Sequence, residues 1–330
     1  MRAVVSKQPG GPDSLEIVEL EPSTPGPKDV VLEVKAIGVN FPDFLIIQDK
    51  YQFKPERPFS PGGEVSGIVK SVGSDVSDLK VGDRVIGSCG WGGYRDELVI
   101  EASRCIPIPD AMPFDEASAF ILTYGTSYYG LKRRGSPKPG DSLFILGAAG
   151  GVGVAAIELG KAMDLKVIAA VSTQDKLDFC LSKGADTGLV YPTGELDRDQ
   201  QKELSNQIKT VSDGGVDIIY DAVGGAYAEP SLRAMNWEGR YLVVGFPAGI
   251  PKIPLNLTLL KSCDIRGVFW GAWARQFPDQ YENDVKELFE FYLAGKIKPH
   301  ISAKFPLEES AEAIKHLSER KATGKVVITT

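Results

Sequence analysis

The residues with the clearest chemical pattern lie near the middle of the 330-residue chain, in the segment Gly147-Ala148-Ala149-Gly150-Gly151-Val152-Gly153. An apolar run over 142–146 predicts a buried strand before it, and helical spacing over 152–163 predicts a helix after it. Backbone N–H groups at a helix N-terminus bind phosphates, and side chains at the turn would block their approach. We therefore expect a dinucleotide to bind at Ala149, Gly150, Gly151, Val152 and Gly153, with an ordinary strand–helix turn as the alternative.

The end of the following strand indicates which dinucleotide binds. Units that bind NAD carry an Asp or Glu about 20 residues past the glycines, where it contacts the ribose 2′-hydroxyl. This chain has Ser172-Thr173-Gln174 at that place, and Lys176 follows one helical turn later. Because a hydroxyl and an ammonium would bind a 2′-phosphate, we predict NADPH, held by Ser172 and Lys176. Asp175 could turn toward the ribose instead, and Lys176 could be a solvated helix residue.

Composition excludes several other kinds of site. The chain has 2 His and 4 Cys, and no pair of cysteines has C-x-x-C spacing, so we expect reduced thiols and no metal site. The net charge is -7 and no run of Lys and Arg reaches five, which argues against nucleic acid and anionic membranes as partners. No segment approaches about 18 apolar residues, and no secretory signal follows Met1, so we expect a cytoplasmic protein without a membrane span.

Two regions must position these residues. Residues 1–120 are rich in short strand patterns, whereas from about residue 141 buried strands alternate with helices, which predicts an α/β fold with a doubly wound parallel sheet. After residue 265 the alternation stops, so we expect the last segment to return to the first domain. The predicted strands are 30–37, 65–72, 142–146, 166–171, 216–220, 239–245, 264–269 and 325–329, and the predicted helices are 152–163, 174–183, 280–294 and 308–319.

Several motifs in order give the chain a family resemblance over essentially its whole length. It resembles the quinone oxidoreductases of the zeta-crystallin type, which belong to the medium-chain dehydrogenase/reductase superfamily. The motifs are Gly38-Val39-Asn40-Phe41-Pro42-Asp43, Pro61-Gly62-Gly63-Glu64-Val65-Ser66-Gly67, Val81-Gly82-Asp83-Arg84-Val85, the glycine-rich segment, Asp221-Ala222-Val223-Gly224-Gly225 and Gly324-Lys325-Val326-Val327. Two departures are Glu158, where many members carry Gln, and Phe144, where many carry Leu.

The resemblance implies a fold and an assembly. It implies a GroES-like, β-rich catalytic domain from residues 1–123 and 265–330, and a Rossmann NADPH-binding domain from 124–264. It also implies a homodimer made by pairing of Rossmann sheet edges, here through 264–269. An edge covered by a helix is the alternative.

The resemblance also implies chemistry without zinc. Zinc-dependent relatives place a Cys where this chain has Asn40 and a His where it has Gly63. Without a Lewis acid, hydride transfer suits acceptors that are already electron-poor. We therefore expect an NADPH-dependent enzyme that reduces quinones or α,β-unsaturated carbonyl compounds. The alternatives are a reductase of enoyl or acryloyl thioesters or 2-haloacrylates, and a redox-silent, crystallin-like NADPH-binding protein.

Two residues of the first domain are candidate catalytic groups. Asn40 could hydrogen-bond nicotinamide, ribose or the substrate carbonyl, or it could satisfy its own turn. The resemblance implies a tyrosine facing the acceptor near this position, so Tyr51 could orient the acceptor oxygen or donate a proton, and an exposed loop aromatic is its alternative.

Further cofactor contacts are expected from strand ends and from the resemblance. Six of them have a simpler alternative: a helix N-cap for Thr126, a surface position for Tyr191, core packing for the strand-end aromatics Phe246, Phe269 and Trp270, and a solvated lysine for Lys325. The expected contacts are Thr126, Tyr191, Val223, Gly245, Phe246, Phe269, Trp270 and, near the phosphates, Lys325.

Overall fold

The computed structural model describes residues 1–330, and its contacts divide the chain into two compact units. The first unit comprises Met1–Leu122 and Pro299–Thr330, and the second comprises Thr123–Lys298. Residues 265–298, which we expected in the first domain, belong by their contacts to the second unit. The physical reason is visible in its ion pairs, because Asp284 binds Lys132 at 3.0 Å and Arg133 at 2.8 Å.

The first unit is built around antiparallel strands. One sheet has the order β14-β15-β3-β4-β5-β7, β6 pairs with β3 off this path, and β1 and β2 form a separate pair. Only β14 and β15 pair in parallel. The strands are β1 (Arg2–Ser6), β2 (Leu15–Glu19), β3 (Asp29–Val39), β4 (Glu64–Val72), β5 (Arg84–Ser88), β6 (Glu97–Glu101), β7 (Cys105–Pro107), β14 (Ile301–Pro306) and β15 (Lys325–Thr329), and the helices are α1 (Phe41–Ile46), α2 (Phe114–Ala117) and α11 (Ser310–Ser318).

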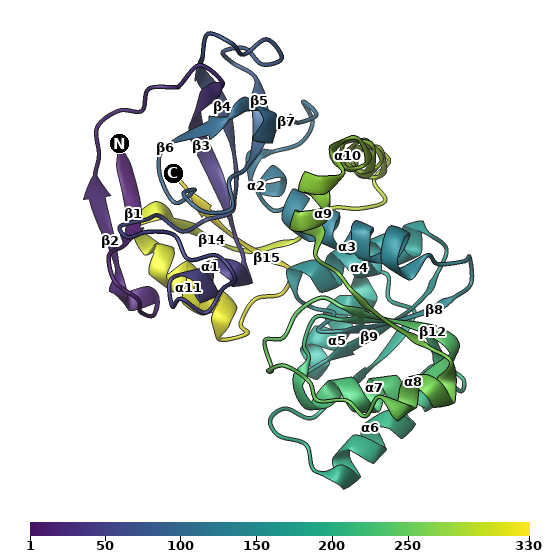
Figure 1. Ribbon diagram of the computed structural model, residues 1–330. Coiled ribbons are helices and arrows are strands. Elements are labelled where there is room, and N and C mark those ends of the chain that lie inside the picture. The colour runs from purple at the N-terminus through teal and green to yellow at the C-terminus, as the bar shows by residue number, and fades with distance from the viewer. The chain divides into compact units, whose positions relative to one another are not determined.

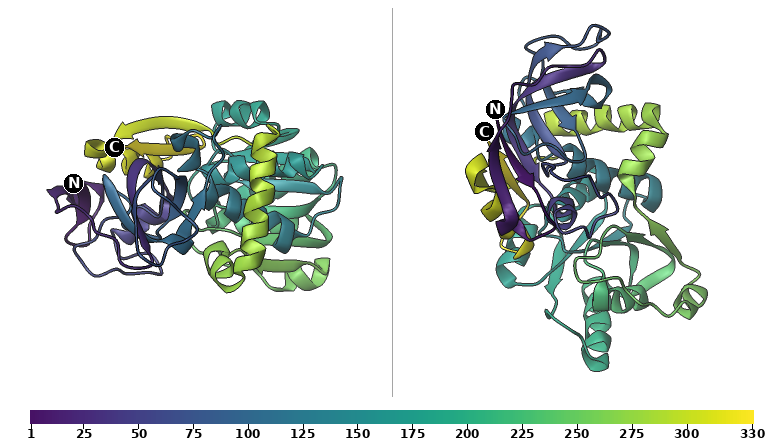
Figure 2. Two further views of the ribbon diagram at one scale, coloured as in Figure 1. Left: turned by 90° about the horizontal axis from the view of Figure 1, so that it is seen from above. Right: turned by 60° about the vertical axis from the view of Figure 1, so that its left-hand side comes forward.

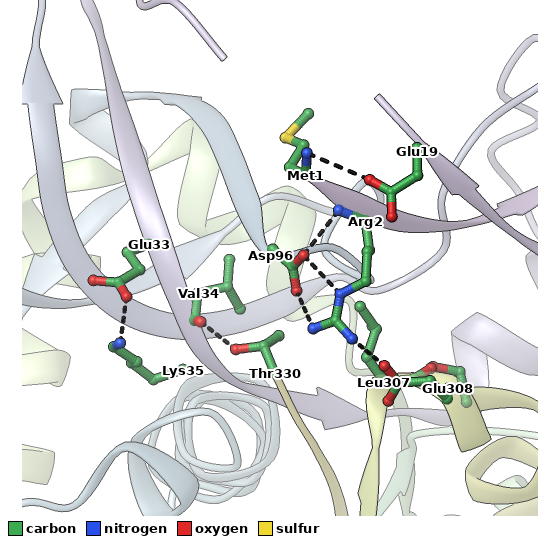
Figure 3. Close-up of polar contacts among 11 residues, drawn as sticks. Met1, Arg2, Glu19, Glu33, Val34, Lys35, Asp96, Leu307, Glu308 and Thr330 are labelled. Atoms are coloured by element: carbon green, nitrogen blue, oxygen red, sulfur yellow. Dashed lines mark hydrogen bonds and ion pairs between the residues drawn. The ribbon is translucent and has the colours of Figure 1, made fainter. Parts of the chain in front are cut away.

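Both ends of the chain lie in this first unit (Figures 1 and 2). Arg2 binds Asp96 at 3.0 Å and also pairs with Glu308, which comes from the returning segment (Figure 3). The Thr330 hydroxyl donates to the carbonyl of Val34 in β3. The last strand, β15, lies between β14 and β3, so residues from the end of the chain complete the sheet.

The second unit contains a six-stranded sheet in which every pair is parallel, with the order β10-β9-β8-β11-β12-β13. This order, in which the chain starts in the middle and winds outward in both directions, is the one typical of dinucleotide-binding sheets. It confirms the predicted doubly wound α/β fold. The strands are β8 (Ser142–Leu146), β9 (Lys166–Val171), β10 (Thr187–Val190), β11 (Val216–Asp221), β12 (Met235–Val243) and β13 (Asp264–Gly267).

Helices cover both faces of this sheet, and α6, α7 and α8 lie below it in the view of Figure 1. All five residues of β8 are buried, as the continuous apolar run predicted. Helix α10 is a single long helix in Figure 2. The helices are α3 (Thr126–Tyr128), α4 (Gly151–Ala162), α5 (Gln174–Ser182), α6 (Arg198–Val211), α7 (Ala228–Arg233), α8 (Asn256–Lys261), α9 (Trp270–Gln276) and α10 (Pro278–Leu293).

One helical stretch has an unusual geometry. Short α3 is flanked by π-helical turns over Ile121–Gly125 and Tyr129–Gly135, so residues 121–135 form one continuous helical stretch. The chain passes from the first unit to the second inside it, between Leu122 and Thr123. None of the helices combines the length and the apolar character that crossing a bilayer requires.

Candidate functional site

The glycine-rich turn joins β8 to α4 and places its residues as the sequence predicts. Gly147 has a φ of +74°, a backbone conformation that favours glycine. A Cβ added to Gly153 would lie 2.4 Å from the carbonyl oxygen of Gly147 and 2.6 Å from that of Ala148, so only glycine lets α4 pack this closely on the turn. A Cβ on Gly150 would meet nothing closer than 3.5 Å, which leaves its face of the turn open for a ligand.

The loop after β11 lies against this turn. A Cβ on Gly147 would come within 2.9 Å of the Val223 side chain, so Val223 contacts the glycine-rich turn. The buried carboxylate of Asp221 fixes the loop, because its Oδ1 accepts the N–H groups of Val223 and Gly224, each at 2.8 Å. The hydroxyl of Tyr241 donates to its other oxygen. Asp221 was not among the predicted site residues.

The end of β9 carries the residues predicted to read the 2′-phosphate. Ser172 is half-buried directly after β9, and Thr173 caps α5 by accepting the Lys176 N–H at 3.3 Å. Lys176 therefore lies in the first turn of α5, five residues beyond Val171, the last residue of β9. Asp175 is exposed in the same turn. The structure thus brings Ser172 and Lys176 together on one short segment.

Tyr191 follows β10 immediately and is buried, so the alternative of a surface tyrosine is wrong. Its backbone N–H donates to the carbonyl of Val171 at 2.8 Å, which ties it to the end of β9. Its ring packs on Tyr227 with a centroid separation of 4.8 Å. Tyr191 therefore lies at the same sheet edge as Ser172.

The remaining contacts predicted in the second unit lie past β12 and β13 or in α3. The Gly245 N–H donates to the Asp221 carbonyl at 3.2 Å, and Phe246 follows it with an exposed ring. Phe269 is also exposed, so core packing does not account for either phenylalanine. Trp270 begins α9, and a Cβ on Gly125 would lie 2.9 Å from its ring.

Thr126 follows Gly125 in the helical stretch that packs on Trp270. Because this stretch continues through Thr126, the alternative of an N-cap does not apply. The predicted cofactor residues of the second unit therefore gather at the carboxyl ends of its parallel strands or on α3, next to the aromatic ring of α9.

In the first unit, Asn40 and Lys325 form one buried contact. The Lys325 ammonium donates to Asn40 Oδ1 at 2.6 Å and to the carbonyl of Val39 at 2.9 Å. Asn40 Nδ2 donates to the carbonyl of Gly38 at 3.0 Å. Lys325 is 5% exposed, so the solvated alternative is wrong, and its ammonium is directed at Asn40 inside the unit.

Two buried acids accompany this pair. Asp43 accepts the Asn40 N–H at 2.8 Å, and burial raises its pKa to about 6, although Asn40 and Lys325 lower it in part. Glu64 accepts the Leu122 N–H at 2.9 Å, and burial raises its pKa to about 7 against the influence of Lys325. Glu64 Oε2 is buried without a hydrogen-bond partner. Burial lowers the pKa of Lys325, and the two carboxylates oppose that shift.

Asp43 and Glu64 were not among the predicted site residues, although both stand in the motifs that carried the resemblance. A signal was present, because each acid sits in an apolar segment where ionised groups are rare. Their sequence neighbours gave no sign of a lysine more than 250 positions away. These residues form the buried charge cluster of the first unit, defined as Asn40, Asp43, Glu64 and Lys325.

Tyr51 lies after α1 and is half-buried, with its ring packed against the core of the first unit. It meets Phe53 edge-on at a centroid distance of 5.9 Å, and Phe53 lies 6.3 Å from Trp91. Tyr51 is therefore not an exposed loop residue. These three rings form an aromatic row, Tyr51-Phe53-Trp91.

The donor set does not fit a zinc ion. Asn40 presents an amide whose oxygen already binds the Lys325 ammonium, and Gly63 has no side chain to offer. No three His, Cys, Asp or Glu side chains gather in an arrangement that could hold a metal ion.

Two family models match the chain. Residues 26–110 match the "Alcohol dehydrogenase GroES-like domain" and residues 151–291 match the "Zinc-binding dehydrogenase". A protein from Bos taurus named quinone oxidoreductase-like protein 2 is 36% identical over 317 residues, which cover 96% of this chain and 89% of that protein. The human quinone oxidoreductase is 31% identical over 99% of this chain and 97% of its own length.

A solved structure has the same fold throughout. The Escherichia coli quinone oxidoreductase complexed with NADPH superposes with a TM-score of 0.91 and 29% identity, and all of both chains is covered. The similarity therefore spans both units as well as the glycine-rich turn.

Proposed function

Because the chain belongs to the quinone oxidoreductase family of zinc-free medium-chain dehydrogenases/reductases, we propose that it is an NADPH-dependent reductase of quinones or α,β-unsaturated carbonyl compounds. The glycine-rich turn is the observation that carries this proposal, since its open face at Gly150 and closed packing at Gly153 suit a bound pyrophosphate. A relative that matches along its entire chain was solved with NADPH.

The preference for NADPH rests on the end of β9. Ser172 and Lys176 supply a hydroxyl and an ammonium to a 2′-phosphate, and Thr173 fixes the turn that carries Lys176. An acid at this place would repel that phosphate, and the strand end has none. In this proposal Tyr191, Val223, Gly245, Phe246, Phe269, Trp270 and Thr126 line the remainder of the cofactor site.

Bound NADPH supplies a hydride to the acceptor. The protein's part is to align the acceptor and to stabilise the oxygen that gains charge. We assign these tasks to Asn40 and Tyr51, with the Tyr51 hydroxyl orienting the acceptor oxygen and donating the proton it needs. The aromatic row Tyr51-Phe53-Trp91 supports planar acceptors, because flat rings stack on aromatic side chains. We place Lys325 behind Asn40, where its ammonium fixes the amide.

A panel of acceptors tests the proposal. NADPH oxidation is measured with 1,4-benzoquinone, 9,10-phenanthrenequinone, an enone and acryloyl-CoA, and kcat/KM is compared with that for NADH. We expect turnover with the quinones or the enone and a preference for NADPH that Lys176→Ala reduces about tenfold or more. Asp178→Ala, which changes an exposed residue of the same helix, is the matched control. Turnover confined to acryloyl-CoA would favour a thioester reductase, and tight binding without turnover would favour a redox-silent protein.

We also propose a homodimer formed through β13. This strand pairs only with β12, so its outer edge is open, and Leu255, Leu259 and Ile265 nearby are exposed. The molar mass in solution tests this proposal, and a monomer at micromolar concentration contradicts it. The cytoplasm remains our proposed compartment, supported by four free, buried cysteines.

A further inference from the structure

The chain crosses between the two units twice. A residue at or next to each crossing donates a hydrogen bond to the same carboxylate oxygen of the second unit. The first crossing lies at Leu122–Thr123 and the second at Lys298–Pro299. The Tyr124 hydroxyl, next to the first crossing, donates to Glu158 Oε2 at 2.7 Å. The Lys298 backbone N–H, at the second crossing, donates to the same oxygen at 2.8 Å. Positions 174 residues apart in sequence thus share one acceptor.

This shared acceptor is a buried carboxylate. Glu158 is 9% exposed and lies on the buried face of α4. Burial raises its pKa, while the Lys298 N–H, the Tyr124 hydroxyl and the charge of Lys183 hold the increase down. Breaking either bond would leave a buried polar group without its partner, which is costly, so the two bonds hold both crossings to α4.

The helix that carries Glu158 is the one that begins at the glycine-rich turn. Glu158 lies two turns along α4 from Gly151. A third contact joins the same elements, because the Ser127 hydroxyl donates to the carbonyl of Val152 at 2.8 Å. The first crossing is therefore hydrogen-bonded to α4 both beside the turn and at Glu158, and the second crossing is hydrogen-bonded to α4 at Glu158.

We propose that Glu158 is a positioning residue that ties both chain crossings to the helix behind the glycine-rich turn, so that a dinucleotide bound at the turn stiffens both crossings together. This inference rests on the proposed function for its ligand, whereas the two hydrogen bonds to Glu158 are tested without that ligand. A rigid helix with one end at the ligand and one side chain at both crossings provides the physical connection.

Hydrogen exchange of the full-length protein without ligand tests the tie. We expect Glu158→Leu, which removes the acceptor, to speed exchange about tenfold or more in peptides covering both 120–130 and 294–302. Tyr124→Phe should speed it only in the first peptide. Glu158→Gln keeps an acceptor oxygen in place and should change neither. Glu203→Leu on α6 makes the same change at an exposed helix position, away from both crossings, and is the control. If Glu158→Leu affects one crossing or none, the inference is wrong.

NADPH then tests the coupling. In the wild-type protein we expect NADPH to slow exchange in both peptides, and in Glu158→Leu to slow it in neither, although its Kd for NADPH changes less than about threefold. In steady-state kinetics the kcat of Glu158→Leu should fall by a larger factor than its Kd for NADPH rises. The kcat of Glu158→Gln should be close to that of the wild-type protein. A wild-type protein that binds NADPH without protecting both crossings overturns the coupling. A wild-type protein that does not bind NADPH overturns the proposed function, while the ligand-free arm still decides the tie.

If Glu158→Leu fails to fold, Tyr124→Phe keeps the inference testable. It removes one of the two bonds and leaves the carboxylate in place, so the second crossing must stay protected while the first opens. If Tyr124→Phe loses protection equally at both crossings, Glu158 does not hold the two crossings through separate hydrogen bonds.

Discussion

Lys325 lies among the buried groups of the first unit, where two acids and one lysine share a small volume. Each of its two hydrogen bonds goes to an oxygen at the junction of β3 and α1. An isolated buried charge is costly, and the cluster avoids that cost by facing the ammonium with carboxyl groups. With Lys325 charged, the cluster is neutral when one of the two acids is protonated.

The pH dependence of stability tests this description. Glu64 has an ordinary pKa of 4.5 and a pKa of about 7 in the fold, so the folded state holds its proton more tightly. Its contribution to the free energy of unfolding therefore falls as pH rises from about 4.5 to 7, by about 3 kcal/mol. Glu64→Gln has no such proton, so its stability relative to wild type should increase over this range.

Urea unfolding at pH 5 and pH 8 measures that difference. The exposed Glu203→Gln on α6 is the control, since its difference from wild type should not follow the same course. A constant difference between Glu64→Gln and wild type at the two pH values would show that Glu64 is ionised throughout.

Tyr51→Phe separates two roles of Tyr51. The ring keeps its contacts with Phe53 and the core, so the stability of the protein should change little. If the hydroxyl donates the proton, kcat falls about 10²–10⁴-fold. Steady-state oxidation of NADPH with a quinone measures kcat. Tyr129→Phe in the second unit is the control. An unchanged kcat across several acceptors removes the acid role and leaves a packing role.

At the scale of elements, two glycines of one turn should respond differently to the same substitution. Gly153→Ala places a methyl group 2.4 Å from a carbonyl oxygen, so α4 must shift, which we expect to destabilise the protein by about 1–3 kcal/mol and to weaken NADPH binding. Gly150→Ala meets nothing closer than 3.5 Å, so the fold should be unaffected while NADPH binding weakens about tenfold or more.

Thermal unfolding and an NADPH titration distinguish these outcomes. If Gly150→Ala binds NADPH as well as wild type, the pyrophosphate does not approach this face of the turn. If Gly153→Ala keeps its stability, the close approach of helix and turn is not required.

Elements with a strong apolar period were predictable. Strand β8 has the predicted bounds, and α4 differs by one residue at each end, because continuous burial and helical spacing are local signals. Helix α6 was not predicted, since its sequence is rich in Gln, Glu and Lys and it buries only Leu204, Ser205 and Ile208. The π-helical turns around α3 arise from packing and have no local signature.

The candidate site was predictable to a similar extent. The residues around the glycine-rich turn follow from strand ends, which the sequence marks. The role of Lys325 does not, because its partner Asn40 lies at the other end of the chain and their contact exists only in the folded sheet. Asp221 and Glu158 act through hydrogen bonds to distant or backbone groups, and no spacing rule points to either.

At the scale of the whole molecule, the last strand is the critical test of how the first unit is built. Val326, Val327 and Ile328 of β15 are completely buried, and removing three such side chains forfeits about 5–9 kcal/mol, comparable with the entire stability of a domain. We expect deletion of 325–330 to unfold the first unit and leave the second unit folded. Hydrogen exchange measures this, with Thr330→Ala as the control. Loss of protection in both units would show that they depend on each other.

The position of β15 in the sequence also determines the order in which the two units can fold during protein synthesis. Residues 123–298 contain every strand of the second sheet, so this unit can fold as soon as it leaves the ribosome. The first 122 residues are made earlier, yet their sheet lacks the strand that joins β14 to β3 until residues 325–329 emerge. At usual rates of translation, residues 36–39 of β3 wait roughly 10–40 s without the strand that they pair with in the fold, while 29–33 already have β6 as a partner. The part of the protein that is made first is therefore finished last, and a chaperone that shields unpaired strands would act on it during that interval.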